Sequence, residues 1–273
     1  MPPRWITAED AAQRIPDNAI LALGGMTVYR RPVGFVLSML RRTPRPQNLT
    51  LLCFTAGYES DLLIGAGCVS AIRSCYVGLE AFGFAPMFTE QANQGSLTVI
   101  EETEASLALG LRAAASNVPW LPSRAWLGTD LLRLRPDVQP LPAPWEGLLT
   151  FPATRPDIAV IHGLEGDENG SVRLNNNLGV DTELCTVAEI VIATVERRIP
   201  SIDPACGDPI IPPPGIDYLV EMPSGALPTS LFPKYPVSGG EMMRYVDYCN
   251  AGKFDTYLNA VLTSGFPSPA LDV

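Results

Sequence analysis

The chain of 273 residues carries 19 basic and 29 acidic side chains, a formal net charge of −10, and 47% of its residues are hydrophobic. This charge gives no electrostatic support for binding nucleic acid, although a local pair such as Arg41 and Arg42 could hold a small anion. No stretch reaches the roughly 20 apolar residues that a membrane span requires, and the N-terminus lacks the apolar core of a secretory signal. We therefore expect a soluble cytoplasmic protein with no membrane contact.

Short apolar runs alternate with amphipathic segments along the chain. Runs that are apolar throughout, such as 19–23, are typical of strands covered on both faces. The pattern predicts an α/β fold with a mostly parallel sheet and helices on both faces. The expected strands are 19–23, 49–54, 71–76, 97–100, 158–161, 190–195 and 218–221. The expected helices are 8–14, 32–42, 81–94, 104–116 and 254–264.

Two proline-rich stretches, 136–156 and 200–214, interrupt this pattern. Proline removes a backbone donor and fixes φ, so we expect no regular secondary structure in the first of them. Both stretches keep apolar residues that can pack on the body of the protein, and the length suits one large α/β domain. We expect a single domain over residues 1–273 with two irregular excursions.

A glycine pair, Gly24-Gly25, follows the first of these strands, and Pro32 then suits the first turn of a helix. Ligands of α/β proteins usually bind at the carboxyl ends of parallel strands, and glycine lets a bound group approach the main chain closely. The alternative is an ordinary glycine-rich turn between a strand and a helix.

Cysteine and histidine usage limits the chemistry that this chain can supply. The six cysteines form no Cys-x-x-Cys pair and have no histidine nearby, so we expect buried, reduced thiols and no metal site. His162 is the single histidine, which leaves little for a histidine-based triad. It either lines a ligand cleft at the end of its strand or is a satisfied structural histidine.

The segment from Asp17 to Pro32 combines an Asp-Asn pair, an apolar run, Gly24-Gly25-Met26 and an Arg-Arg-Pro sequence. Further blocks follow at 63–69, 76–88, 110–115 and 119–122. Over residues 5–200, this set resembles the alpha subunit of class I CoA-transferases of the glutaconate type. Met26 stands where that family usually has Phe, and Arg30 stands where many members have Gly.

The resemblance implies an enzyme that moves CoA between an acyl-CoA and a carboxylic acid, dicarboxylic or 3-oxo, through a glutamyl thioester. In this family the partner beta subunit supplies the nucleophilic glutamate from a Ser-Glu-Asn-Gly motif. The corresponding stretch here, 51–57, has no glutamate, and Glu168 comes much later in the chain, so we do not expect Glu168 to be a nucleophile. We therefore expect a heterodimer or heterotetramer with a homologous beta subunit, with coenzyme A entering as acyl-CoA.

The resemblance also places residues of the glycine turn in the substrate site. Gly24 and Gly25 are expected beside the acyl group, as hydrogen-bond donors or as close-packing positions, with Met26 next to them. Arg30 and Arg31 either pair with the second carboxylate of a dicarboxylic substrate or are solvated surface arginines or an interface pair.

Glu104 opens an expected helix shortly after two further carboxylates, Glu101 and Glu102. One interpretation is a helix cap, stabilised by the exposed N–H groups of the first turn. The other is that this stretch resembles the ring-opening hydrolases of steroid catabolism, which implies a catalytic glutamate at Glu104. General-base action would need a raised pKa, through burial or through the neighbouring carboxylates. A third hypothesis is a non-catalytic ligand-binding or regulatory subunit of the same fold.

Overall fold

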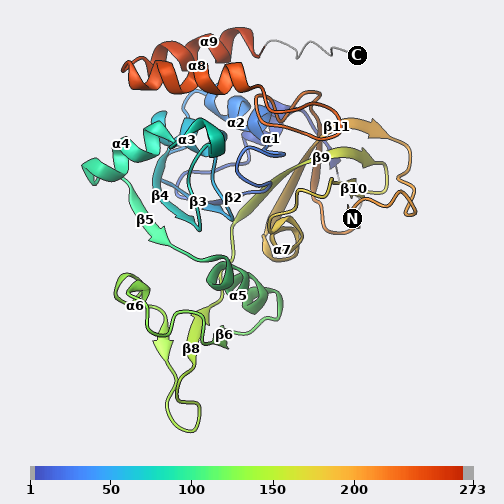
Figure 1. Ribbon diagram of the computed structural model, residues 1–273. Coiled ribbons are helices and arrows are strands. Elements are labelled where there is room, and N and C mark those ends of the chain that lie inside the picture. The colour runs from blue at the N-terminus through green and yellow to red at the C-terminus, as the bar shows by residue number, and fades with distance from the viewer. Residues whose placement is uncertain (1–3, 267–273) are drawn as a thin grey trace.

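Parallel strands form the centre of the molecule in the computed structural model, which describes residues 4–266 (Figure 1). They are β1 (Arg4–Trp5), β2 (Ile20–Leu23), β3 (Leu49–Cys53), β4 (Val69–Ser74), β5 (Thr98–Glu101), β9 (Ile158–Asp167), β11 (Ile190–Ile199) and β13 (Tyr218–Glu221). Their order across the sheet is β1-β13-β11-β9-β2-β3-β4-β5, and each neighbouring pair is parallel. Two short antiparallel strands, β10 (Val172–Arg173) and β12 (Ile210–Ile211), extend the sheet beside β9. The mostly parallel sheet predicted from the sequence is confirmed.

The direction in which the chain crosses the sheet reverses between β2 and β9. Strands β3, β4 and β5 follow one another on one side of β2, whereas β9, β11 and β13 follow one another on the other side. Strand β2 ends at Leu23, opposite Val160, while β9 continues to Asp167. Open α/β sheets bind ligands outside the carboxyl ends of the strands at such a reversal. The turn at Gly24-Gly25 lies at this position.

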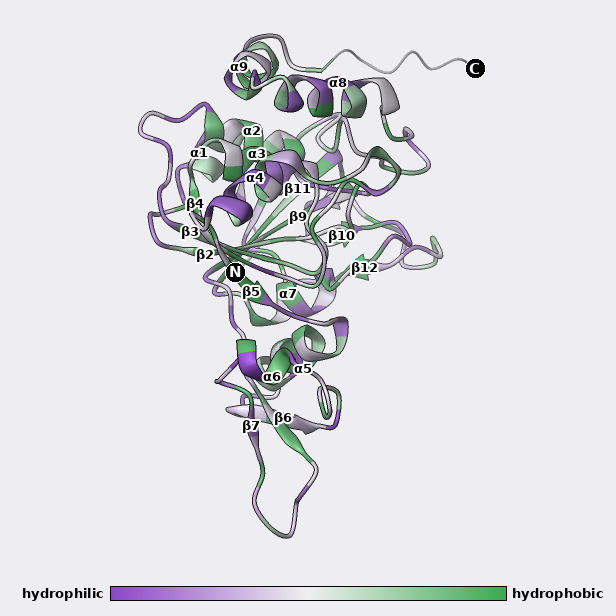
Figure 2. Ribbon diagram, turned by 60° about the vertical axis from the view of Figure 1, so that its left-hand side comes forward, coloured by the Kyte–Doolittle hydropathy of each residue, from purple (hydrophilic) through white to green (hydrophobic). Residues whose placement is uncertain are grey.

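Helices cover both faces of the sheet (Figure 1). On one face lie α1 (Ala8–Ala12), α2 (Val33–Leu40), α3 (Tyr58–Gly65) and α4 (Pro86–Gln94), with α8 (Gly239–Asn250) and α9 (Phe254–Ser264) as an outer layer, and on the other face lie α5 (Glu104–Ala115) and α7 (Asp181–Val187). Side chains alternate along β2 accordingly, because Leu21 and Leu23 join the core under α2 and α3 whereas Ala22 joins the core under α5 and α7. Figure 2 shows the hydrophobic residues concentrated on these central strands and inward-facing helices. No helix within residues 4–266 has the length and apolar character needed to cross a bilayer.

An insertion between α5 and β9, here called the lobe (residues 117–156), projects away from the sheet (Figure 1). It contains the helix α6 (Leu131–Leu134) and an antiparallel sheet in the order β6-β8-β7, made of β6 (Trp120–Ser123), β7 (Gln139–Pro140) and β8 (Leu149–Pro152). Trp126 and Phe151 meet edge to face inside it, with ring centroids 5.2 Å apart. The prediction that 136–156 holds no regular structure is wrong at β7 and β8. Proline is tolerated there because Pro140 lies in an edge strand and Pro152 ends the central one.

Several elements differ from those expected. The helix expected at 81–94 starts only at Pro86, after the short 3-10 turn η1 (Glu80–Phe82), since proline suits the first helical turn. Helices α3, α6, α7 and α8 and the sheet of the lobe were not expected from the sequence. The second proline-rich stretch, 200–214, is irregular except at β12. That the whole chain is one domain stays a prediction.

Candidate functional site

A buried carboxylate at the start of α7, Asp181, holds the glycine turn after β2. The Gly25 N–H donates to Asp181 Oδ1 at 3.0 Å, and the Gly24 N–H donates to the Val160 carbonyl at 2.9 Å. A Cβ on Gly24 would overlap Asp181 Oδ1, and Gly25 has a φ of +80°, which favours glycine. Both N–H groups have partners within this chain, so the geometry supports the close-packing role expected of the pair more than the donor role.

Arg30 is fully buried beneath this turn. Its guanidinium lies 2.6 Å from Asp181 Oδ2 and donates to the carbonyls of His162 at 2.8 Å and Asn177 at 3.1 Å. Burial alone would raise the pKa of Asp181, but the Arg30 charge and the N–H groups of Gly25 and Gly179 outweigh burial and hold that pKa below its ordinary value. The alternative of a solvated Arg30 is wrong, and contact of Arg30 with a substrate carboxylate stays a prediction.

Arg31 is buried as well and points in the other direction, toward the turn after β3. It forms an ion pair with Glu59 of α3 and donates to the Thr55 carbonyl at 2.9 Å. Burial disfavours the charged guanidinium, yet the attraction of Glu59 prevails and raises the pKa of Arg31 above its ordinary value. The Thr27 N–H donates to Thr55 Oγ1 at 2.9 Å, so the turns after β2 and β3 form one rigid unit. A solvated Arg31 is therefore also wrong.

Met26 lies half-buried at the outer side of the same turn. Its N–H donates to the Tyr29 carbonyl at 3.0 Å, and the Tyr29 N–H donates to the Met26 carbonyl at 2.8 Å. Between them Thr27 has a φ of +46°, a strained conformation for a β-branched residue. Strain of this kind persists only where the surroundings enforce it, and it occurs often at functional sites.

His162 is fully buried, and both ring nitrogens have side-chain partners. Nδ1 lies 2.8 Å from Thr194 Oγ1, and Nε2 lies 3.1 Å from Glu196 Oε1. Burial lowers the pKa of His162 below its ordinary value, although Glu196 acts in the opposite direction. These contacts are those of a satisfied structural histidine, and its carbonyl supports Arg30.

Glu104 is the first residue of α5 and is exposed at the carboxyl edge of the sheet, close after β5. The cap of this helix is formed by other residues, because Ser106 N–H donates to Thr103 Oγ1 at 3.2 Å and Thr103 N–H donates to Ser106 Oγ at 2.8 Å. The capping interpretation of Glu104 is therefore wrong. Its carboxylate lies in the first turn of α5, where the partial positive charge of a helix N-terminus favours an acidic side chain.

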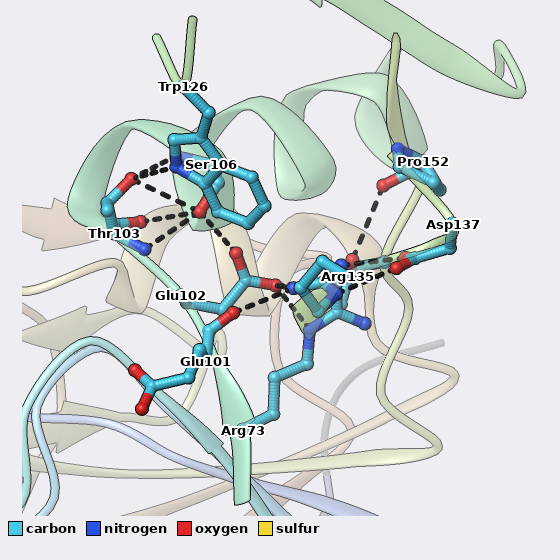
Figure 3. A network of polar contacts seen from close by, with 10 residues as sticks. Arg73, Glu101, Glu102, Thr103, Ser106, Trp126, Arg135, Asp137 and Pro152 are labelled. Carbon is cyan, nitrogen blue, oxygen red and sulfur yellow. Dashed lines mark hydrogen bonds and ion pairs between the residues drawn. The ribbon is translucent and has the colours of Figure 1, made fainter. Parts of the chain in front are cut away.

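The buried carboxylate at this junction belongs to Glu102, which is 4% exposed (Figure 3). Its Oε1 accepts from Arg73 Nε at 2.6 Å and from Arg135 Nη1 at 2.7 Å, and its Oε2 accepts from Ser106 Oγ. Arg135 also donates to the Glu101 carbonyl at 2.9 Å. This Glu102 network joins β4, the start of α5 and the lobe, and it fixes the backbone two residues before Glu104. Sequence reasoning missed it because Arg135 is 33 residues away.

Cys75 and Glu168 are two further groups whose chemistry is that of possible nucleophiles. Burial and the nearby carboxylates of Glu102 and Glu104 raise the pKa of Cys75 to about 12, so its thiol stays protonated near neutral pH. Glu168 is exposed, and both of its oxygens accept from Arg198, at 2.6 and 2.8 Å.

The cysteines are free thiols as expected, but Cys206 is exposed, contrary to the expectation of burial.

The parallel sheet with helices on both faces defines an α/β protein. Its candidate ligand site lies at the carboxyl ends of β2 and β9, where the direction in which the chain crosses the sheet reverses. Residues 6–222 match the family model described as Coenzyme A transferase. The chain belongs to the coenzyme A transferase family.

Curated relatives within the family differ in activity. The chain is 29% identical to the A-type subunit of the 3-oxoadipate CoA-transferase of Pseudomonas knackmussii, over 82% of this chain and 80% of the relative. It is 30% identical to the IpdA subunit of the cholesterol ring-cleaving hydrolase of Rhodococcus jostii, over 81% of this chain and 78% of the relative.

Solved structures agree with the fold. The structure of the decarboxylase AibA/AibB matches with a TM-score of 0.87 at 28% identity, over 96% of this chain and 100% of the matched chain. Glutaconate CoA-transferase from Acidaminococcus fermentans matches with a TM-score of 0.79 at 26% identity, over 94% of this chain and 92% of the matched chain. Transferases, a hydrolase and a decarboxylase are thus all similar to this chain.

Proposed function

We propose that this chain is the A-type subunit of a heteromeric CoA-transferase that moves CoA between an acyl-CoA and a carboxylic acid, dicarboxylic or 3-oxo. A homologous B-type subunit supplies the nucleophilic glutamate, which attacks the thioester carbonyl and displaces the CoA thiolate to form a mixed anhydride. The thiolate then attacks the glutamyl carbonyl of the anhydride, which releases the donor acid and leaves the glutamyl-CoA thioester; the acceptor acid takes up CoA by the reverse of these two steps. The present chain contributes the wall built from the turns after β2 and β3.

The observation that carries this proposal is the glycine turn at the sheet reversal, in a chain of this family. The turn is locked by Asp181, Arg30 and Arg31, so it offers a preorganised surface close to the main chain. The neighbouring turn, 54–57, contains no acidic residue, and Glu59, which follows it, is buried against Arg31. These features support a nucleophile from another chain.

The test is CoA exchange by the complex of this chain with its B-type subunit. We expect transfer of CoA from an acyl-CoA to free acids of a panel that includes dicarboxylic and 3-oxo acids. The variant Glu104→Gln should exchange CoA at a rate within about twofold of the wild-type rate. Glu101→Gln changes an exposed neighbouring carboxylate; it is the matched control and should behave in the same way. Absence of exchange over the whole panel would overturn the proposal.

The second candidate function is hydrolysis or ring opening of a CoA thioester with Glu104 as general base. It is favoured by the exposed carboxylate of Glu104 at the carboxyl edge, beside the rigid Glu102 network, and by the similarity to the IpdA subunit. Burial of Glu104 by a partner chain or substrate would raise its pKa toward the working range of a base. This function predicts loss of the thioester without any acceptor acid, abolished by Glu104→Gln and kept by Glu101→Gln; wild-type rates in Glu104→Gln would exclude it.

A non-catalytic binding subunit is the third hypothesis. It predicts that the complex binds acyl-CoA yet neither exchanges CoA with free acids nor consumes the thioester. The two activity assays above, run with the same complex, separate it from both enzymatic functions.

A further inference from the structure

A hollow of about 330 Å³ lies beside the part of β9 that extends past the end of β2. Leu164 of β9, Arg173 of β10, residues 175–177 and residues 232–234 line it, together with Asp208. Leu164 comes four residues after Val160, the partner of the last residue of β2. The hollow, called the Lys234 hollow below, is therefore on the carboxyl side of the sheet, where ligands of open α/β sheets bind.

The Lys234 hollow and the glycine turn share a wall. Asn177 lines the hollow, and its carbonyl accepts from Arg30 Nη2 at 3.1 Å. Arg30 in turn holds Asp181, whose other oxygen accepts from the Gly25 N–H at 3.0 Å. A second bond, from Asn175 Nδ2 to the Phe232 carbonyl at 2.8 Å, ties the two lining loops together. The hollow is thus built on the same rigid framework as the proposed acyl-CoA site.

Lys234 carries the available positive charge of this lining. Arg173 is already neutralised, because it pairs with Glu165 at 2.8 Å and with Asp208 at 2.7 Å. Lys234, by contrast, has no carboxylate within 4.0 Å among residues 4–266. Beside it Phe232 is 71% exposed, and Asn176 is exposed as well. Lys234, Asn176 and Phe232 thus bring a cation, an amide and an apolar ring to one small hollow. Such a lining suits a ligand with a short carbon chain that ends in a carboxylate.

The volume sets the size of the ligand. Ligand pockets run from about 300 to 1,000 Å³, so this one is near the small end of that range. A short-chain organic acid fits such a volume. We propose that the Lys234 hollow is a subsite for a small carboxylic acid, with the Lys234 ammonium binding its carboxylate; this rests on the proposed function only in taking that acid to be the acceptor of the transfer.

Binding can be tested on the full chain, with glutarate as the charged probe and glutaramide as its neutral isostere. Isothermal titration calorimetry should detect binding of glutarate and no binding of glutaramide. Lys234→Met should lower the affinity for glutarate about tenfold, because one charge-assisted hydrogen bond is lost. Lys234→Arg should keep most of the wild-type affinity. Lys253→Met is the matched control, since Lys253 is the one other lysine of the sequence and is exposed at the start of α9. Unchanged glutarate affinity in Lys234→Met would overturn the proposal.

Chemical labelling gives an independent readout, because the sequence holds only these two lysines. Acetylation by an N-hydroxysuccinimide ester, followed by mass spectrometry, should show Lys234 protected by glutarate and Lys253 labelled at the same rate with and without it. Equal rates at Lys234 would refute the subsite. Neither measurement needs a partner subunit or turnover, so failure of CoA exchange and failure of this subsite are separate results.

Discussion

Replacing Arg30 by Met tests whether the buried pair with Asp181 holds the candidate site together. The substitution removes the ion pair with Asp181 and the two hydrogen bonds to the carbonyls of His162 and Asn177. Asp181, whose side chain is fully buried, then keeps only the N–H groups of Gly25 and Gly179, at 3.0 and 3.3 Å. Met fills much of the volume, so the main cost is an uncompensated buried carboxylate.

Breaking a buried ion pair by removing one partner costs about 3 to 5 kcal/mol. For a chain of this length, that corresponds to a fall in melting temperature of roughly 5 to 9 °C. Urea unfolding should show the same loss as a lower midpoint. The double variant Arg30→Met with Asp181→Leu should recover much of the stability, because it leaves no unpaired charge.

The matched control is Arg133→Met. Arg133 and Asp130 form an ion pair on α6 at 3.2 Å, but their side chains are 84% and 87% exposed. An exposed pair contributes between 0 and about 1 kcal/mol, so this variant should unfold nearly like the wild type. The reasoning is refuted if Arg30→Met costs no more than Arg133→Met, or if the double variant is less stable than Arg30→Met alone.

Two further predictions concern His162 and Glu102. Burial lowers the pKa of folded His162, so the unfolded chain takes up a proton below about pH 6.5 that the folded chain does not, and stability should fall as the pH drops below that value. Proton NMR of this single histidine should show a titration midpoint below pH 6.5 in the folded chain; a folded pKa of 6.5 or higher would contradict the burial argument. Glu102→Gln removes the charge partner of Arg73 and Arg135, so it should cost about 2 kcal/mol and speed amide exchange within the lobe but not in β2 or β3. Asp130→Asn is its control, and equal exchange in both variants would count against the Glu102 network as the anchor of the lobe.

Much of the central sheet could be predicted from the sequence. Strands such as β2 and β3 are short runs of apolar residues, and their composition follows directly from burial on both faces. Helix α3 was missed because its buried face carries Glu59, Ser60 and Asp61, so no apolar periodicity is visible. Glu59 pairs with Arg31, and Asp61 accepts from Tyr245 and from the Phe88 N–H, which only the folded chain brings near.

The candidate site, too, could be predicted from the sequence only in part. The glycine turn was predictable, because a glycine pair at a strand end implies close packing of the main chain. The environments of the arginines were not, since Asp181 lies 151 residues from Arg30. The sequence left open a contact of Arg30 with a substrate carboxylate and a solvated or interface position, and the buried pair with Asp181 was not among these alternatives. A helix cap was one of two interpretations of Glu104, but Thr103 and Ser106 form the capping box that α5 uses.

By itself, the sequence determined the parallel α/β sheet and the position of the glycine turn, because local hydrophobic patterns and glycine at a strand end depend on neighbours along the chain. The family followed from the resemblance of several sequence blocks and from the match of residues 6–222 to the family model. Only the tertiary structure decided which charges are buried and paired: Arg30 with Asp181, Arg31 with Glu59, and Glu102 with Arg73 and Arg135. It also decided that Lys234 stands at a small hollow beside β9. The reason is physical, because the energy of a charge depends on its desolvation and on partners that chain folding brings from far away in the sequence.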